Sequence, residues 1–181
     1  MKSYFTLRFE RMLSPAEASA LAAEARTAGC ELEVRSNERF ARTYALVSSE
    51  RDGASDFAAR YEDAGRYADP LLALSIEPQA TEALRPLAAA LTGSGAPEGV
   101  LSANILDHAL LIEFFPARTS WRFVRALIDV ELARYGSTVR RTMLLSPLTA
   151  DMEIQIAADG LQEPELNESR VLEALLSDAD R

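Results

Sequence analysis

Apolar and polar residues alternate at the start of the chain. In Tyr4–Glu10 three apolar side chains fall on one side and polar side chains on the other, a pattern typical of a half-buried strand. The letters SPAE follow, in which Ser14 is a favourable N-cap and Glu17 stands where it can complete a capping box. The sequence therefore predicts a strand and then a helix that Gly29 ends.

Two further strands are predicted directly after this helix. Cys30–Val34 and Phe40–Val47 have the composition of strands, and the polar letters RSNER separate them as a turn. Two strands joined by a short turn favour an antiparallel hairpin. The first part of the chain is thus predicted to be a β-α-β-β unit.

The middle of the chain is predicted to be mostly helical. Apolar residues recur at helical spacing in the letters SDFAARYEDAGRY, and a second helix is expected over 79–91, where Pro86 should kink or divide it. The letters LLALSI between them favour a short strand. Thr92–Gly99, TGSGAPEG, is rich in glycine, which is typical of a surface loop or of a seam between two halves.

The opening order of elements returns after this segment. An apolar strand through Phe115, a helix that begins at Thr119 or Ser120, and strands over Thr138–Leu145 and Asp151–Ala157 are predicted there. The expected fold class is α+β, with an antiparallel or mixed sheet and helices mainly on one face. A pseudo-duplicated domain of two β-α-β-β units is one form of this class, although residue identity between the two stretches is slight.

One domain is expected over residues 1–160, with halves 1–92 and 100–160 joined by a linker at 93–99 as the duplicated alternative. Residues 161–181 are expected to form an acidic C-terminal tail that contains a short helix. The apolar stripe of that helix consists of Val171, Leu172, Leu175 and Leu176.

The balance of charge favours some partners over others. The 181 residues include 28 acidic and 19 basic side chains, a formal net charge of −9. Such a charge repels nucleic acid and anionic membrane surfaces, so neither is expected as a partner, and a protein with a basic surface is favoured instead. The general alternative is that acidity only keeps the protein in solution.

Composition also bears on the compartment. No apolar run approaches the roughly 18 residues of a membrane span, and the alternating N-terminus lacks the apolar core of a signal peptide, so a cytoplasmic location is expected. Cys30 is the single cysteine, which excludes an intramolecular disulfide and a cysteine-rich zinc site. We expect Cys30 to be a buried structural thiol.

His108, the single histidine, follows Asp107 inside the most apolar stretch of the chain, LDHALLIEFF. Successive side chains on a strand point to opposite faces, so Asp107 and His108 would point apart, with His108 on the more apolar face. A buried, neutral imidazole is therefore expected rather than a catalytic one. A hairpin tip or a bulge at this point would change the geometry.

Familiar routes to catalysis find little support in the sequence. The two-histidine zinc motifs are excluded, no serine stands in a G-x-S-x-G elbow, and Asp107 and Glu113 would be about 20 Å apart along an extended strand. Neither a phosphate-binding loop nor a calcium-binding loop is recognisable. The sequence therefore favours a non-enzyme, and no cofactor or metal is expected.

Three arginines form the strongest candidate for a ligand site. Arg118, Arg122 and Arg125 stand at i, i+4 and i+7 around the predicted helix start, where guanidinium groups and free backbone amides both suit an anion. The alternative is a solvated helix side on which Arg125 pairs with Asp129. Trp121, beside them, is either a core residue or an interface anchor.

These observations lead to three hypotheses about function. The first is non-enzymatic protein binding, as in an adaptor, an export chaperone or an inhibitor, with a homodimer as one form of it. Its expected contact residues, besides the exposed acidic faces, are Trp121, Leu172, Leu175 and Leu176. The second is regulatory binding of a small molecule or anion by the arginine cluster, and the third is a small enzyme that uses His108.

Overall fold

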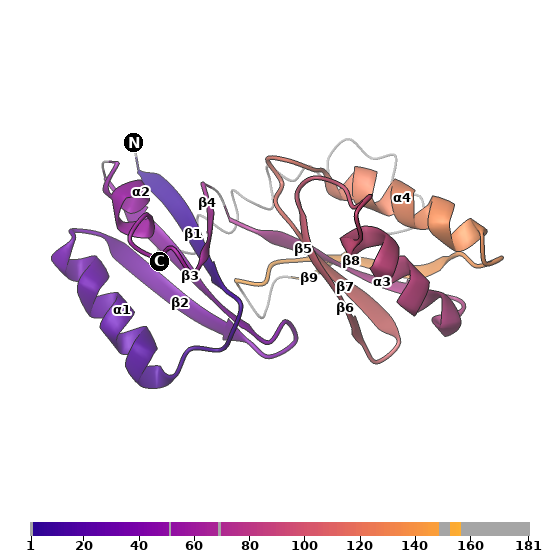
Figure 1. Ribbon diagram of the computed structural model, residues 1–181, viewed down its shortest axis with the longest axis horizontal. Coiled ribbons are helices and arrows are strands. Elements are labelled where there is room, and N and C mark those ends of the chain that lie inside the picture. Colours follow the sequence, from indigo (N-terminus) through magenta and orange to yellow (C-terminus); the bar gives the residue numbers. More distant parts are fainter. Residues whose placement is uncertain (1, 51, 69, 149–152, 157–181) are drawn as a thin grey trace. The chain divides into compact units, whose positions relative to one another are not determined.

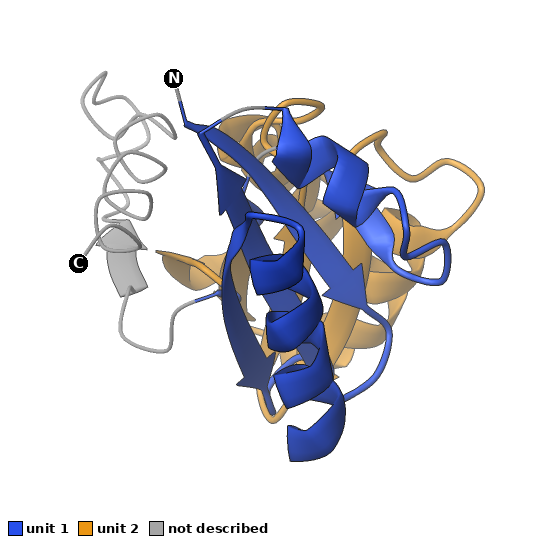
Figure 2. Cartoon of the chain, turned by 90° about the vertical axis from the view of Figure 1, so that its left-hand side faces the viewer, with its two compact units in different colours: residues 1–71, 147–150 blue, residues 72–146, 151–181 orange. Residues whose placement is uncertain are grey.

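The structure, a computed structural model, describes residues 2–50, 52–68, 70–148 and 153–156 (Figure 1). The chain divides into two compact units: unit 1 comprises residues 1–71 and 147–150, and unit 2 comprises residues 72–146 and 151–181 (Figure 2). Each unit combines an antiparallel sheet with helices, so the predicted α+β class is confirmed. The glycine-rich segment at 93–99 lies inside unit 2.

The described strands of unit 1 form a four-stranded antiparallel sheet with the order β2-β3-β1-β4. Its elements are β1 (Ser3–Phe9), α1 (Pro15–Thr27), β2 (Glu31–Asn37), β3 (Arg42–Ser49), α2 (Gly53–Ala58) and β4 (Gly65–Tyr67).

Helix α1 begins as the sequence predicts. The Ser14 hydroxyl accepts a hydrogen bond from the Glu17 amide at 3.2 Å, and the Glu17 carboxylate accepts one from the Ser14 amide at 2.7 Å. The predicted β2–β3 hairpin is also confirmed, although β2 continues through Asn37 and shortens the turn. The helix predicted in SDFAARYEDAGRY is confirmed only for the first four letters, because α2 ends at Ala58 and the letters GRY form β4 by pairing with β1.

The described strands of unit 2 form a five-stranded antiparallel sheet with the order β6-β7-β5-β8-β9. Its elements are β5 (Leu72–Pro78), the 3-10 helix η1 (Thr81–Ala83), α3 (Leu84–Thr92), β6 (Val100–Leu106), β7 (Ala109–Phe114), α4 (Trp121–Ala133), β8 (Val139–Leu145) and β9 (Glu153–Ile156). The letters LLALSI do form a strand, β5. Pro86 falls in the first turn of α3, where its missing amide leaves no intrahelical bond unmade.

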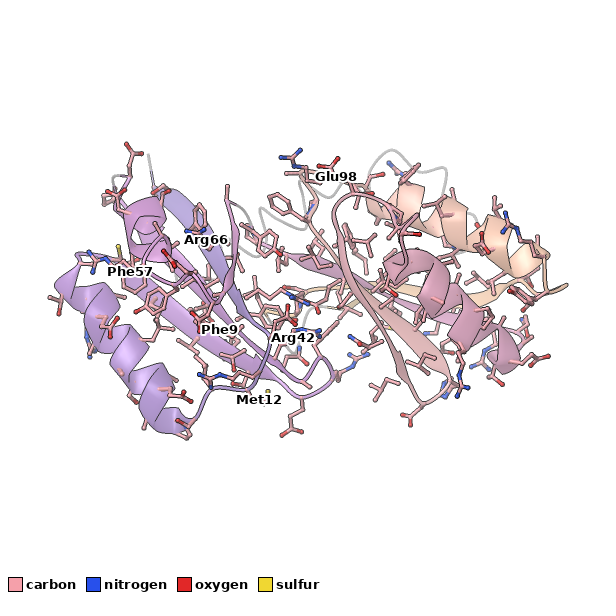
Figure 3. All side chains as sticks on the ribbon, viewed as in Figure 1. Phe9, Met12, Arg42, Phe57, Arg66 and Glu98 are labelled. Carbon is pink, nitrogen blue, oxygen red and sulfur yellow. The ribbon has the colours of Figure 1, made fainter. Side chains whose placement is uncertain are left out.

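In each unit the helices pack on one face of the sheet. Phe9 and Phe57 in unit 1 belong to a core that α1 and α2 form with β1 and β3 (Figure 3). The core of unit 2 joins α3 and α4 to β5, β7 and β8. No helix in the described part of the chain is long and apolar enough to cross a membrane.

The two units share one topology. Unit 1 runs β1-α1-β2-β3-α2-β4 and unit 2 runs β5-α3-β6-β7-α4-β8, and the strand orders β2-β3-β1-β4 and β6-β7-β5-β8 correspond position by position. This β-α-β-β-α-β arrangement is the ferredoxin-like, or split β-α-β, topology. The second β-α-β-β repeat is predicted to start at β7, whereas the observed repeat starts at β5. The prediction is wrong because the sequence pattern merges β6 and β7 into one strand. Strand β9 is an addition beyond the repeat.

Candidate functional site

Helix α4 carries most of the residues that the sequence singles out. The Ser120 hydroxyl caps it by accepting a hydrogen bond from the Phe123 amide at 3.1 Å, so the predicted start at Ser120 is confirmed. Its inner side is buried against the sheet of unit 2. That inner side consists of Trp121, Val124, Ile128 and Leu132.

Trp121 lies in the core of unit 2 with 1% of its surface exposed. Of the two alternatives that the sequence offers for Trp121, a core residue and an interface anchor, the structure therefore supports the core residue. Its ring supports α4 from the inside and is covered from solvent.

Arg125 ties α4 to strand β8. Its Nη1 donates to the Thr142 hydroxyl at 2.8 Å, and its Nε and Nη2 donate to Asp129 Oδ1 at 3.2 and 3.0 Å. The side chain is only 11% exposed. The pairing with Asp129 that the sequence offers as an alternative is thus present, and it fixes the guanidinium against the sheet.

The other two arginines of the predicted cluster have separate partners. Arg118 donates to Glu98 at 3.1 Å, and both side chains are exposed; Glu98 is labelled in Figure 3. The Arg122 guanidinium lies over the Trp121 ring, 5.1 Å from its centroid. Because each arginine has its own contacts, the geometry adds no support to anion binding over protein binding.

The outer side of α4 carries a second apolar stripe. Phe123 is 53% exposed and Val130 is 58% exposed. The outer stripe, as we call it, consists of Phe123, Ala126, Val130 and Ala133. Its members stand at i, i+3, i+7 and i+10, so they form one line along the helix. Amphipathic surface helices normally carry polar residues in this place.

Sequence reasoning misses the outer stripe, although the signal for it is present. The inner residues alone account for one apolar face of α4, so its remaining positions would be expected to carry polar, solvated side chains. The helix letters WRFVRALIDVELA contain only four charged residues, so apolar residues extend well beyond one face. Such a helix exposes more apolar surface than a helix with a single apolar face.

His108 stands at a hairpin tip, which is the alternative that the sequence leaves open and which corrects the prediction of a buried strand residue. Leu106 pairs with Ala109, so Asp107 and His108 form the two-residue connection of the β6–β7 hairpin, with Asp107 at φ +54°. The His108 side chain is 59% exposed. The imidazole is therefore a surface group.

Glu77, at the end of β5, gathers three basic side chains near this turn. Its carboxylate lies 3.6 Å from His108 Nε2, 2.6 Å from Arg140 Nη2 and 3.8 Å from Arg141 Nη1. Burial by itself would raise the pKa of Glu77, but the hydrogen bond and charge of Arg140, with the charges of His108 and Arg141, outweigh it and lower the pKa. The group holds a carboxylate in its ionised form and joins the hairpin turn to β8.

Cys30 and a hollow beside it offer little chemistry. The thiol is buried, as predicted, and burial raises its pKa, which disfavours the nucleophilic thiolate. A hollow of about 560 Å³ lies close by in unit 1 and is lined by Ala28, Gly29, Ser49, Glu50, Asp52, Gly53 and Asp56. Among the described residues, no three histidine, cysteine, aspartate or glutamate side chains are placed to hold a metal ion.

The predicted partner-binding residues Leu172, Leu175 and Leu176 lie outside the described residues. Comparison with known proteins adds no assignment for the rest: no protein-family model matches the chain, and no curated protein matches it in sequence.

Proposed function

We propose that the chain is a non-enzymatic protein-binding module and that the outer stripe of α4 is its binding surface. The observation that carries the proposal is the exposure of Phe123 and Val130 in line on one helix. Two large exposed apolar side chains stand in line with two exposed alanines, and exposed apolar surface of this kind marks protein contacts. An aromatic side chain at one end is a typical anchor for a partner.

The charges around α4 favour a partner of a particular chemistry. The stretch from Arg118 to Arg141 contains six arginines and two acidic residues, Asp129 and Glu131. Two acidic residues from outside the stretch also pair with its arginines: Glu98 with Arg118, and Glu77 with Arg140 and Arg141. Arg122 and Arg134 stand near the two ends of the outer stripe, and both are exposed. We therefore propose that the partner presents an amphipathic helix whose apolar stripe is flanked by acidic side chains.

The net charge of the whole chain favours a different partner, one with a basic surface. The two expectations are compatible because the negative charge is concentrated in one segment. Residues 151–181 contain nine acidic and two basic side chains, so this segment accounts for −7 of the formal −9. Residues 1–150 are close to neutral. A partner with a basic surface, which the total charge favours, would bind the acidic segment and would not need α4.

Binding by the outer stripe can be tested with glutamate substitutions. Phe123→Glu and Val130→Glu place a charge on the stripe while keeping a strong helix former in α4. Ile105→Glu is the matched control, because Ile105 is also an exposed apolar residue of unit 2 (45%) but lies on the edge strand β6. The tagged full-length proteins are used to capture partners from a lysate of the source cells at low salt.

The expected result is a partner that wild-type protein and Ile105→Glu retain in equal amounts and that Phe123→Glu and Val130→Glu lose. Partners retained equally by all four proteins would refute binding at α4 and would direct attention to the acidic segment 151–181. Fluorescence of Trp121 confirms that each variant keeps unit 2 folded.

A further inference from the structure

We infer that the chain carries its own ligand for α4: residues 167–178 dock on the outer stripe of the same molecule. The inference rests on the proposed function in one respect, namely that the outer stripe receives an acidic amphipathic helix. It adds that residues 167–178 occupy the outer stripe and thereby regulate the binding of other proteins there.

The path of the chain brings this segment to α4. Ile156, the last residue of β9, pairs with Thr142 of β8. The Thr142 hydroxyl is the group that accepts the hydrogen bond of Arg125 from α4. Residues 157–181 therefore follow from a point on the sheet that is directly connected to α4.

The distance to be covered is short compared with the available chain. Helix α4 has 13 residues and is therefore about 20 Å long. The ten residues 157–166 can span up to about 30 Å when extended. Residues 167–178 can thus reach the outer stripe.

The sequence of the segment complements this surface. Val171, Leu172, Leu175 and Leu176 form the predicted apolar stripe of a short helix, about as long as half of the outer stripe. Residues 157–181 contain seven acidic and two basic side chains, whereas the stretch from Arg118 to Arg141 has a net charge of +4. The acidic segment therefore follows the sheet close to a helix whose outer stripe is flanked by the exposed side chains of Arg122 and Arg134.

An occupant in the same chain would regulate the proposed binding site. A tethered ligand acts at an effective concentration on the order of millimolar, so an external helix must displace it before it can bind. Partners that carry a better apolar stripe would succeed, and weaker ones would be excluded. The chain would thus select its partners by competition.

Disulfide trapping tests the contact in the full-length protein. One protein carries Val130→Cys with Leu172→Cys, and a second carries Val130→Cys with Leu176→Cys. Leu172 and Leu176 are one helical turn apart, so the two proteins test two registers of the docked helix against α4. Ile105→Cys with the same two tail substitutions provides the control. Cys30 is buried and adds little background.

Amide hydrogen exchange supplies a second measurement that does not depend on register. Exchange of residues 167–178 is compared between wild-type protein, Val130→Glu and Ile105→Glu. Docking predicts that Val130→Glu speeds exchange in this segment and that Ile105→Glu leaves it unchanged.

The expected outcome is an intrachain disulfide that forms faster in a Val130 pair than in the Ile105 pairs, together with faster tail exchange in Val130→Glu. A disulfide that links two chains would overturn docking in the same molecule and assign the segment to a second copy. Equal trapping in all pairs with unchanged exchange would overturn the inference altogether. These measurements need no partner, so they test docking of residues 167–178 separately from the capture of partners by α4. Either proposal can be refuted while the other is supported.

Discussion

Gly99 joins the loop before β6 to the loop before α4, and its replacement gives a sharp test of the structure of unit 2. Its φ of +94° is one that residues with a side chain rarely adopt. A Cβ at this position would lie 2.7 Å from Arg118 Cβ and 3.2 Å from the Arg118 carbonyl carbon. The Gly99 carbonyl also accepts a hydrogen bond from the Phe115 amide at 2.8 Å, so the two loops cannot separate without losing it.

The expected cost of Gly99→Ala has two parts. Forcing a residue with a Cβ into a left-handed conformation costs about 1–2 kcal/mol. Pushing a methyl group into packed atoms costs about 1–3 kcal/mol, and here the obstacle includes backbone. The free energy of unfolding of unit 2 should therefore fall by about 3 kcal/mol.

Two other glycines of unit 2 separate these contributions. Gly136 has a φ of +63° but nothing within 4 Å of a built Cβ, so Gly136→Ala should cost only about 1 kcal/mol for its conformation. Gly95 has neither a positive φ nor a close neighbour. Gly95→Ala should leave stability unchanged or raise it slightly, because alanine restricts the unfolded chain.

The natural assay is urea unfolding followed by the fluorescence of Trp121. It is the single tryptophan of the chain and lies in the core of unit 2, so its signal reports on this unit. The order of midpoints should be Gly95→Ala highest, then Gly136→Ala, then Gly99→Ala. Equal midpoints for Gly99→Ala and Gly136→Ala would refute the close approach to Arg118.

Two further predictions concern buried polar groups. The Thr6 hydroxyl is buried without a hydrogen-bond partner among the described residues, whereas the Thr43 hydroxyl accepts from the Leu13 amide at 2.8 Å. In urea unfolding followed by circular dichroism, Thr6→Val should therefore be neutral or stabilising by up to about 1 kcal/mol, and Thr43→Val should destabilise by about 1–3 kcal/mol; a larger loss for Thr6→Val would contradict this. The lowered pKa of Glu77 means that its contribution to stability is fully present above pH 4.5 and is lost as the pH falls through the lower folded-state pKa. Glu77→Gln should thus cost about 1–2 kcal/mol at neutral pH and flatten the acid part of the stability profile read from Trp121, whereas an unchanged profile would exclude a role for this carboxylate.

Local chemistry explains which parts of the fold could be predicted. Ser14 and Ser120 accept hydrogen bonds from amides that a helix start leaves unpaired, so each start can be found from a few adjacent residues. Tyr4–Glu10 alternates because one face of β1 packs against helices, although Thr6 and Arg8 on the other face are buried as well, so the predicted half-buried strand is wrong for that face. These rules need no knowledge of distant parts of the chain, and they fix the α+β class.

The sequence offers the β6–β7 hairpin only as an alternative to a single strand, because its turn has an uncommon sequence. Two-residue turns favour Asn-Gly or Asp-Gly, and Asp107-His108 matches only at its first position. Without a turn, the apolar residues on both sides are read as one strand, which places His108 in the core and shifts the frame of the second repeat. In the structure β7 pairs with β5, and this pairing of distant residues cannot be predicted from the apolar pattern of one stretch.

The candidate site escaped prediction for a related reason. The arginines in and before α4 can be recognised by their spacing, and so can the pair of Arg125 with Asp129, but their other partners depend on tertiary contacts. Thr142 of β8 and Glu98, which precedes β6, become partners only after the sheet has formed. The outer stripe was present in the sequence and required a search for a second apolar line on the same helix.

The fifth strand of unit 2 has a consequence for the behaviour of the protein in concentrated solution. Open sheet edges are templates for pairing between molecules, and in unit 1 the edge formed by β4 is only three residues long. The corresponding strand in unit 2, β8, has seven residues, and β9 pairs with its outer side. Loss of residues 153–156 would leave that longer edge without its cover, so we expect aggregation to be the first defect of a chain shortened there, ahead of any change in the fold.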